Sequence, residues 1–201
     1  MQSKLFKIMG LLLVAALMTV TVTACKKRDA NRVVVKGSTT VLPITQKAAE
    51  AFKKSGGASV FVEGSGSGNG IKALIDGSCD IANSSREMKK EEKEAAAKKG
   101  IKLREIVVAY DMIVPIVHES NVVSNLVIDQ LKAIYDGSIT RWKDLGGRDE
   151  EVVVISRDTS SGTYEVWEEK VMKKTDVTQR ALLQASNGAI ITTVAGNPKA
   201  I

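Results

Sequence analysis

The chain has 201 residues, of which 44% are hydrophobic and 26% are charged, an ordinary balance for a globular protein. Its formal net charge of +6 suits an anionic small ligand or an anionic membrane surface, but the basic residues are not clustered as in a nucleic-acid binder. The single histidine, His118, and the two cysteines form no Cys/His cluster, so no metal site and no cofactor are predicted.

Residues 1–24 have the pattern of a secretory signal peptide. Lys4 and Lys7 precede an apolar run over residues 10–22 that is short for a membrane span. The run ends in Val-Thr-Ala-Cys, which resembles the lipobox of bacterial lipoproteins and implies cleavage before Cys25 and lipidation of its thiol. The alternative is a plain signal peptide with an incidental cysteine. We expect a lipidated linker over residues 25–31 that attaches the protein to a membrane.

Strands and helices alternate over residues 32–99. Each strand predicted there leads into a loop rich in Ser, Thr or Gly, and a helix follows the loop. In the first helix, Leu42, Ala48, Ala49 and Phe52 fall near one face. Strands are predicted over residues 32–36, 59–63 and 80–83, and helices over residues 41–54, 71–77 and 88–99.

The loop over residues 64–70 has four glycines in seven positions. Such a backbone can approach a ligand closely and turn its N–H groups inward. The loop lacks the Gly-Lys-Ser/Thr of a nucleotide-binding P-loop and the spacing of the dinucleotide fingerprint. The alternative is a plain flexible turn.

Two apolar runs, over residues 102–108 and 110–118, follow each other without an intervening helix. We predict two successive strands, a hinge near residues 109–112, and a passage from a first lobe (32–109) into a second lobe (110–201). A helix is predicted over residues 128–135 and a turn over 141–147. The tail over residues 177–201 is predicted to be helical in two pieces, without a strand.

The most informative segment of the second lobe is a strand over residues 152–155, a Ser/Thr loop and a helix over 164–172. Ser160 or Ser161 would cap the helix, and the free N–H groups of its first turn would form an anion site. Arg157 could bind an oxyanion by donating two parallel hydrogen bonds. The alternative is an ordinary capped helix with a solvated arginine.

In parallel sheets, ligands bind beyond the carboxyl ends of the strands, where these loops would converge. The assembled site would hold many hydroxyl and N–H donors, Arg157 and Arg86, without a nucleophile–base pair. That donor set favours binding of a tetrahedral oxyanion.

Several segments together resemble the phosphate-binding proteins of the bacterial phosphate ABC transporter. The resemblance implies an α/β, two-lobed periplasmic-binding-protein-like (type II) fold with mainly parallel sheets. It further implies that the protein captures inorganic phosphate between its lobes and delivers it to an ABC permease. The protein would then lie outside the cytoplasm, lipid-anchored at the cell membrane or in the periplasm. The segments are residues 37–41, 66–70, 80–86, 135–142 and 157–163.

The resemblance also implies a set of phosphate-binding residues. Many family members carry an aspartate at the position of Ser85, which accepts a hydrogen bond from a protonated phosphate oxygen. A serine can also accept that bond, but it does not repel a fully ionised anion such as sulfate. The implied residues are Ser38, Thr39, Thr40, Ser67, Ser85, Arg86, Arg157, Ser161, Gly162 and Thr163.

Family members continue past the position of Ile201 and return to the first lobe, so we expect a C-terminally truncated chain whose first lobe is incomplete. Three alternatives stay open: a serine-dependent hydrolase or phosphoryl transferase that uses Ser161 or Ser67 with His118, a receptor for another oxyanion, and a signalling or adhesive lipoprotein. We expect a monomer without enzymatic activity, without catalytic residues and without affinity for nucleic acid.

Overall fold

The computed structural model describes residues 31–201, and Val33–Ile201 form one compact unit. The predicted signal peptide, the predicted lipidation site Cys25 and almost all of the predicted linker lie outside the described residues. Within residues 31–201, no helix is long and apolar enough to cross a bilayer.

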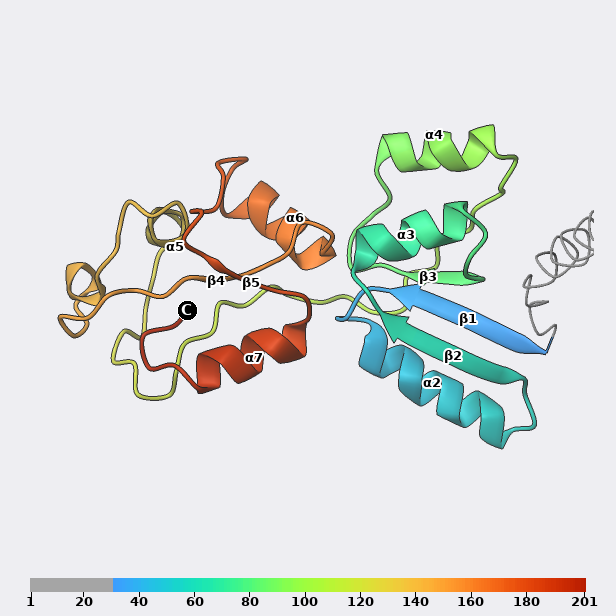
Figure 1. Cartoon of the computed structure of the whole chain (residues 1–201), viewed down its shortest axis with the longest axis horizontal. Coiled ribbons are helices and arrows are strands. Elements are labelled where there is room, and N and C mark those ends of the chain that lie inside the picture. The colour runs from blue at the N-terminus through green and yellow to red at the C-terminus, as the bar shows by residue number, and fades with distance from the viewer. Residues whose placement is uncertain (1–30) are drawn as a thin grey trace, which may run out of the picture. The chain divides into compact units, whose positions relative to one another are not determined.

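The first part of the described chain builds a three-stranded sheet in the order β2-β1-β3. Strands β1 and β3 are parallel, with Val35 opposite Ile81 and Gly37 opposite Asn83. A helix follows each strand, as predicted. We call these six elements the N-terminal half (Figure 1): β1 (Arg32–Gly37), α2 (Leu42–Lys54), β2 (Ser59–Gly64), α3 (Ser67–Ile75), β3 (Ile81–Asn83) and α4 (Lys90–Lys98).

The core of the N-terminal half forms where α3 meets α4. Ile71 and Ile75 of α3 pack against Ala96 of α4, and all three side chains are buried. The remainder of α4 is largely Lys and Glu, and Ala96 is its one buried residue. This small core fixes the start of α3, where the glycine-rich loop ends.

The apolar face predicted for the first helix is not buried. Helix α2 lies against β2, but none of its residues is buried and Phe52 is 49% exposed. A helical period identifies which side chains share a face. Burial also requires a surface that covers that face, and a three-stranded sheet supplies only part of one.

The two strands predicted over residues 102–108 and 110–118 are absent. The structure has neither helix nor strand over residues 101–127, and this segment exposes apolar side chains such as Val107 (72%) and Tyr110 (96%). A β-branched, apolar run favours an extended backbone, but a strand also needs a neighbour for its N–H and C=O groups. No strand among residues 31–201 pairs with this segment. The hinge near residues 109–112 stays a prediction.

A second sheet forms later in the chain from two parallel strands, with Ile155 opposite Leu182 and Arg157 opposite Gln184. Short bridges add Arg141 to Glu151 and Val153 to Ala200. We call these elements the C-terminal half (Figure 1): α5 (Ile128–Tyr135), the 3₁₀ helix η1 (Trp142–Leu145), β4 (Ile155–Arg157), α6 (Gly162–Lys170), β5 (Leu182–Gln184) and α7 (Asn187–Ala195).

Two predictions for this half were wrong. The strand expected over residues 152–155 begins only at Ile155, and the tail contains the strand β5 where two helical pieces and no strand were expected. The hydrogen bonds of β5 come from β4, about thirty positions earlier in the sequence, so the short Leu-Leu-Gln segment carries little local signal for a strand.

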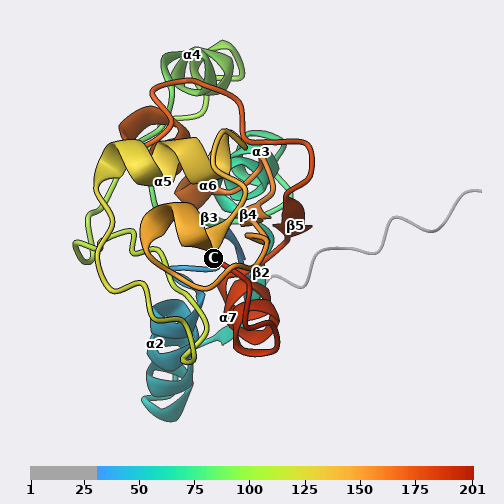
Figure 2. The same cartoon turned by 90° about the vertical axis from the view of Figure 1, so that its left-hand side faces the viewer.

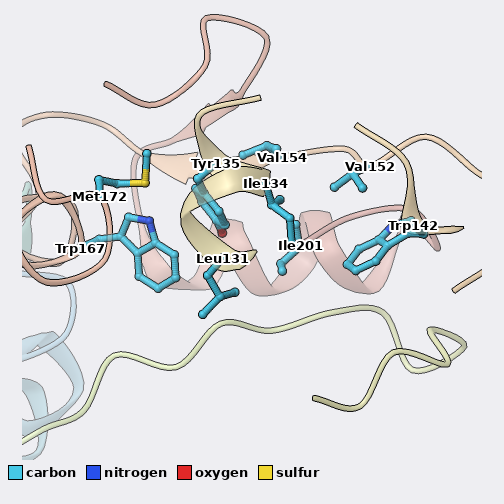
Figure 3. Packing of buried hydrophobic residues seen from close by; sticks show 9 residues of the cluster. All are labelled: Leu131, Ile134, Tyr135, Trp142, Val152, Val154, Trp167, Met172 and Ile201. Carbon is cyan, nitrogen blue, oxygen red and sulfur yellow. The ribbon is translucent and has the colours of Figure 1, made fainter. Parts of the chain in front are cut away.

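The larger core lies in the C-terminal half, around α5 (Figure 3). Ile134 and Met172 are fully buried, and the ring centroids of Tyr135 and Trp167 lie 4.8 Å apart. The C-terminal residue joins this core: the N–H of Ile201 donates to the carbonyl of Val153, and the carbonyl of Ile201 accepts from the N–H of Ile155. Two views show the C-terminus beside β4 (Figure 1, Figure 2). The C-terminal residues thereby fix β4 and the loop that follows it.

Candidate functional site

Strand ends from both halves lead into the same region. β1 runs into the loop of Ser38–Thr40, β3 runs into the loop of Ser85, and β4 runs into the loop that precedes α6. The arrows of β1 and β2 in Figure 1 point toward the starts of α6 and α7. The predicted convergence of these loops is therefore a feature of the structure.

The first loop is held by Ser38, whose side chain is buried. Its N–H donates to the carbonyl of Asn83 at 2.8 Å. Its Oγ accepts from the N–H groups of Thr40 at 3.2 Å and Val41 at 3.4 Å. The hydroxyl proton of Ser38 stays available for donation, because a hydroxyl can accept two hydrogen bonds and donate one.

The glycine-rich loop lets α3 begin directly against β1. A Cβ atom on Gly70 would lie 2.5 Å from the Cα atom of Gly37, so only glycine allows this close approach. The approach buries Ser67, the first residue of α3, completely. The glycines predicted to let the backbone approach a ligand thus also bring α3 onto the sheet.

Ser67, Ser85 and Gly162 meet where the two halves join. The Oγ atoms of Ser67 and Ser85 are 3.2 Å apart, and the N–H of Ser85 donates to Ser67 Oγ at 3.1 Å. A Cβ atom on Gly162 would lie 2.4 Å from Ser67 Oγ and 2.7 Å from Ser85 Oγ. The first turn of α6 therefore lies against both hydroxyl groups.

Hydroxyl groups of the first loop meet the start of α6 as well. Thr40 Oγ1 and Thr163 Oγ1 are 3.4 Å apart. Ser161, rather than Ser160, caps α6: its Oγ accepts from the N–H of Tyr164 at 3.3 Å. The cap satisfies one of the first-turn N–H groups of α6, whose first residue, Gly162, lies against the loops of the N-terminal half.

Arg157 is a buried cation whose hydrogen-bond partners are all neutral. Its side chain donates to the carbonyls of Gln184 and Ala185, each at 3.1 Å, and to Asn187 Oδ1. Among residues 31–201, no carboxylate forms an ion pair with it. Burial lowers the pKa of this guanidinium below its usual value, against a smaller opposite effect of the nearby Asp158 charge. A buried charge without a counter-ion is costly, so an anion at this point would be stabilising.

Arg157 lines a cavity of about 340 Å³ together with Thr40, Thr163 and Asn187. Thr40 and Thr163 also line a neighbouring cavity of about 430 Å³, which Ser85 lines too. Apolar side chains of residues 112–116 also line the first cavity. The polar lining of the first cavity consists of Arg157, hydroxyl groups, the Asn187 amide and one carboxylate, Asp111, and Lys170 adds a cation to the neighbouring cavity. The cations, hydroxyl groups and amide are donors suited to an anion.

Arg86 is held very differently. Its Nη1 and Nη2 atoms donate to the two carboxylate oxygens of Glu92 at 2.8 Å, and its Nε atom lies 2.8 Å from Glu165 Oε2. The hydrogen bond to Glu92 raises the pKa of this guanidinium although burial opposes the rise. Two carboxylates thus compensate the charge of Arg86, whose role as an anion ligand stays a prediction.

Sequence analysis did not identify one residue of this region, Asn187. It begins α7, its Nδ2 donates to Thr40 Oγ1 at 2.9 Å, and its N–H donates to Thr39 Oγ1 at 3.4 Å. The available signal was the Ser-Asn-Gly sequence at the start of the last helix. Ser186 caps α7 as Ser161 caps α6, so the sequence marks a second helix start beside a strand.

The remaining predicted groups are placed as follows. His118 Nδ1 lies 2.9 Å from Ser120 Oγ and accepts from the N–H of Ser120, within its own turn. Within residues 31–201, no group of three His, Cys, Asp or Glu side chains is arranged to hold a metal ion. The ten predicted anion-binding residues lie at strand ends, in the loops that follow them or in the first turn of α3 or α6, and their role as anion ligands stays a prediction.

Comparison with known proteins gives a consistent result. The family model described as "PBP superfamily domain" matches residues 24–201. The curated phosphate-binding protein PstS of Staphylococcus saprophyticus is 38% identical over 169 residues, which are 82% of this chain and 52% of the relative. The PstS of Staphylococcus aureus strain USA300 is 36% identical over 169 residues, 82% of this chain and 51% of the relative. The chain spans about half the length of these curated relatives.

Solved structures agree with the curated relatives. A phosphate-bound substrate-binding protein of a phosphate ABC transporter from Clostridium perfringens is 40% identical, with a TM-score of 0.77 over 84% of this chain and 68% of the other. A phosphate transport receptor from Vibrio cholerae is 33% identical, with a TM-score of 0.61 over the same shares. The likeness extends to the arrangement of α/β elements and parallel strands described above.

Proposed function

Because the chain belongs to the PBP superfamily, we propose that it binds inorganic phosphate as the substrate-binding component of an ABC transporter. Curated relatives named phosphate-binding protein support phosphate as the substrate, and a similar solved structure holds bound phosphate. The partner would be a membrane permease that receives the anion. The proposal concerns the whole substrate-binding protein. The chain spans about half the length of its curated relatives.

One observation supports the proposal above all others: Arg157 is 6% exposed and has only neutral hydrogen-bond partners. An anion beside this buried cation would offset the desolvation cost of its charge. Hydroxyl groups of Thr40 and Thr163, 3.4 Å apart, come from the two halves and can surround the same anion. Closure of the donors around an anion excludes water, and hydrogen bonds then become stronger.

Calorimetric titration of the full chain in mild detergent tests the proposal. We expect phosphate to bind, and Arg157→Gln to weaken binding about tenfold to a hundredfold, the usual value of a hydrogen bond to a charged group. The matched control is Arg148→Gln, because Arg148 is exposed and lines neither of the two cavities described above. A chain that is folded by circular dichroism and gives no heat with phosphate would contradict the proposal.

Selectivity between phosphate and sulfate depends on the groups near Ser85. A carboxylate beside the anion accepts a hydrogen bond from protonated phosphate and repels fully ionised sulfate, whereas a serine hydroxyl does neither as strongly. We therefore propose that excess sulfate competes measurably with phosphate in this chain, and that Ser85→Asp reduces that competition. Equal competition in both proteins would mean that Ser85 does not set the selectivity.

We also propose that Cys25 carries a lipid that holds the protein outside the cytoplasm at a membrane. The support is the sequence before Cys25, because this part lies outside the described residues. Labelling with radioactive palmitate in a bacterial host should be lost in Cys25→Ser and kept in Cys79→Ala, which changes a cysteine that is buried in the structure. Labelling of Cys25→Ser would contradict the proposal.

We propose that the chain is a binding protein and not a hydrolase. His118 bonds within its own turn, and the hydroxyl of Ser161 serves as a helix cap, so neither arrangement resembles a serine activated by a base. His118→Ala should leave phosphate affinity unchanged. Phosphate ester hydrolysis that disappears in His118→Ala would favour the enzymatic alternative.

A further inference from the structure

Asn187 joins the buried cation of one half to the hydroxyl groups of the other. Its Oδ1 accepts from Arg157 Nη1, and its Nδ2 donates to Thr40 Oγ1 at 2.9 Å. Its backbone N–H lies 3.4 Å from Thr39 Oγ1, which accepts from it. One amide therefore contacts Arg157 in β4 and Thr40 in the loop after β1.

The chemistry of an amide explains why this position suits an anion site. A carboxamide has an acceptor oxygen and a donor NH₂ group, and Asn187 uses both. A carboxylate of the same shape would keep the bond to Arg157, but it would cancel the positive charge and repel an incoming anion. Arg86 is an example of a guanidinium whose charge is cancelled in this way, because Glu92 and Glu165 pair with it.

We propose that Asn187 is a positioning residue that holds the Arg157 guanidinium and the Thr40 hydroxyl together while it leaves the Arg157 charge to the anion. The identity of the anion rests on the proposed function above. The positioning does not, because all three contacts of Asn187 are made with groups of the chain itself.

The first test uses the full chain in mild detergent without ligand and compares thermal unfolding midpoints. Asn187→Asp keeps an acceptor for Arg157 and adds a favourable charge, so its midpoint should lie above that of Asn187→Ala. Asn187→Ala and Thr40→Val should not be additive, because each removes the same hydrogen bond. The matched pair of Asn197→Ala and Thr40→Val should be additive, because Asn197 lies beyond the other end of α7 and accepts from Lys199.

The second test measures phosphate affinity, where we expect the opposite order. Asn187→Ala should weaken binding about tenfold by releasing the donors, and Asn187→Asp should weaken it further, by about a hundredfold relative to the unchanged chain. Asn197→Asp should bind like the unchanged chain. A residue with a purely structural role would give the same order in stability and in affinity.

The outcomes separate this inference from the proposed function. If the unchanged chain binds no phosphate, the proposed function fails, and the midpoints alone decide whether Asn187 positions Arg157 and Thr40. Additive midpoints for Asn187→Ala and Thr40→Val would overturn the positioning role. If phosphate binds and Asn187→Asp binds it as well as Asn187→Ala does, the role of the neutral amide is overturned.

Discussion

Arg86 of the N-terminal half and Glu165 of the C-terminal half form an ion pair in which Nε and Oε2 are 2.8 Å apart. Their side chains are only 7% and 15% exposed, so the pair is shielded from water far more than a typical surface ion pair. Lys89 Nζ reaches the same carboxylate oxygen of Glu165 at 2.8 Å. The junction beside the candidate anion site is therefore held by charges as well as by hydroxyl groups.

Removal of this pair should destabilise the protein. In Glu165→Gln, Arg86 keeps Glu92 but loses the carboxylate of α6, and we expect a loss of about 1–3 kcal/mol in the free energy of unfolding. Chemical denaturation measures this loss. Glu50→Gln removes an exposed pair with Lys47 and should cause no measurable change. Equal effects of the two substitutions would mean that the shielded pair contributes nothing to the free energy of unfolding.

Acidification should remove the contribution of Glu92. Burial alone would raise the pKa of Glu92, but hydrogen bonds from Arg86 and from the N–H of Lys89 hold that pKa below its usual value. Because the folded-state pKa is lowered, the contribution is present above the ordinary glutamate pKa of about 4.3 and is lost as the pH falls below it. The difference in unfolding midpoint between the unchanged chain and Glu92→Gln should narrow as the pH falls from about 7 to about 3. A constant difference would contradict this origin.

Gly162→Ala should weaken phosphate binding. The added methyl group would come within 2.4 Å of Ser67 Oγ and 2.7 Å of Ser85 Oγ, which would push the start of α6 away from both hydroxyl groups. We expect a loss of about tenfold or more in affinity by calorimetry, comparable to one displaced hydrogen bond to a charged ligand. Gly188→Ala is the control, because its methyl group would meet only Ser186 Oγ, at 3.9 Å.

The two buried tryptophans should respond differently to replacement by phenylalanine. Trp142 Nε1 donates to the carbonyl of Lys199 at 2.9 Å, whereas Trp167 Nε1 is buried and has no hydrogen-bond partner among the described residues. Both substitutions reduce ring volume in the same core (Figure 3). Trp142→Phe should therefore cost about 1–3 kcal/mol more than Trp167→Phe, measured by chemical denaturation. Equal costs would mean that the Lys199 bond contributes nothing to stability.

The strand predictions failed only after residue 100, because β1, β2 and β3 were predicted to within one residue. Helices α2, α4 and α5 make their hydrogen bonds within the segment, so period, caps and glycine stops locate them to within two residues. Residues 102–118 have the composition of two strands but no partner strand in the described chain. At β5 the prediction missed a strand, because this segment is a strand only through its pairing with β4.

The order of donors along the sequence already located most of the candidate site. Ser38–Thr40, Ser67, Ser85 and Ser161–Thr163 each follow a strand, and parallel strands bring such loops to one edge. Sequence alone therefore determined the α/β class and the convergence of the loops and led to the proposal of an anion site, because these depend on local pattern and on general rules of parallel sheets.

Only the tertiary structure separated the two arginines and identified Asn187. Arg86 follows β3 and Arg157 ends β4, and both side chains are shielded from water. Glu92 and Glu165 compensate the charge of Arg86, whereas carbonyls and an amide surround Arg157. The partners of Arg157 are contributed from about thirty positions further along the chain. The availability of a buried charge depends on which groups the fold brings beside it, and a local sequence pattern does not contain that information.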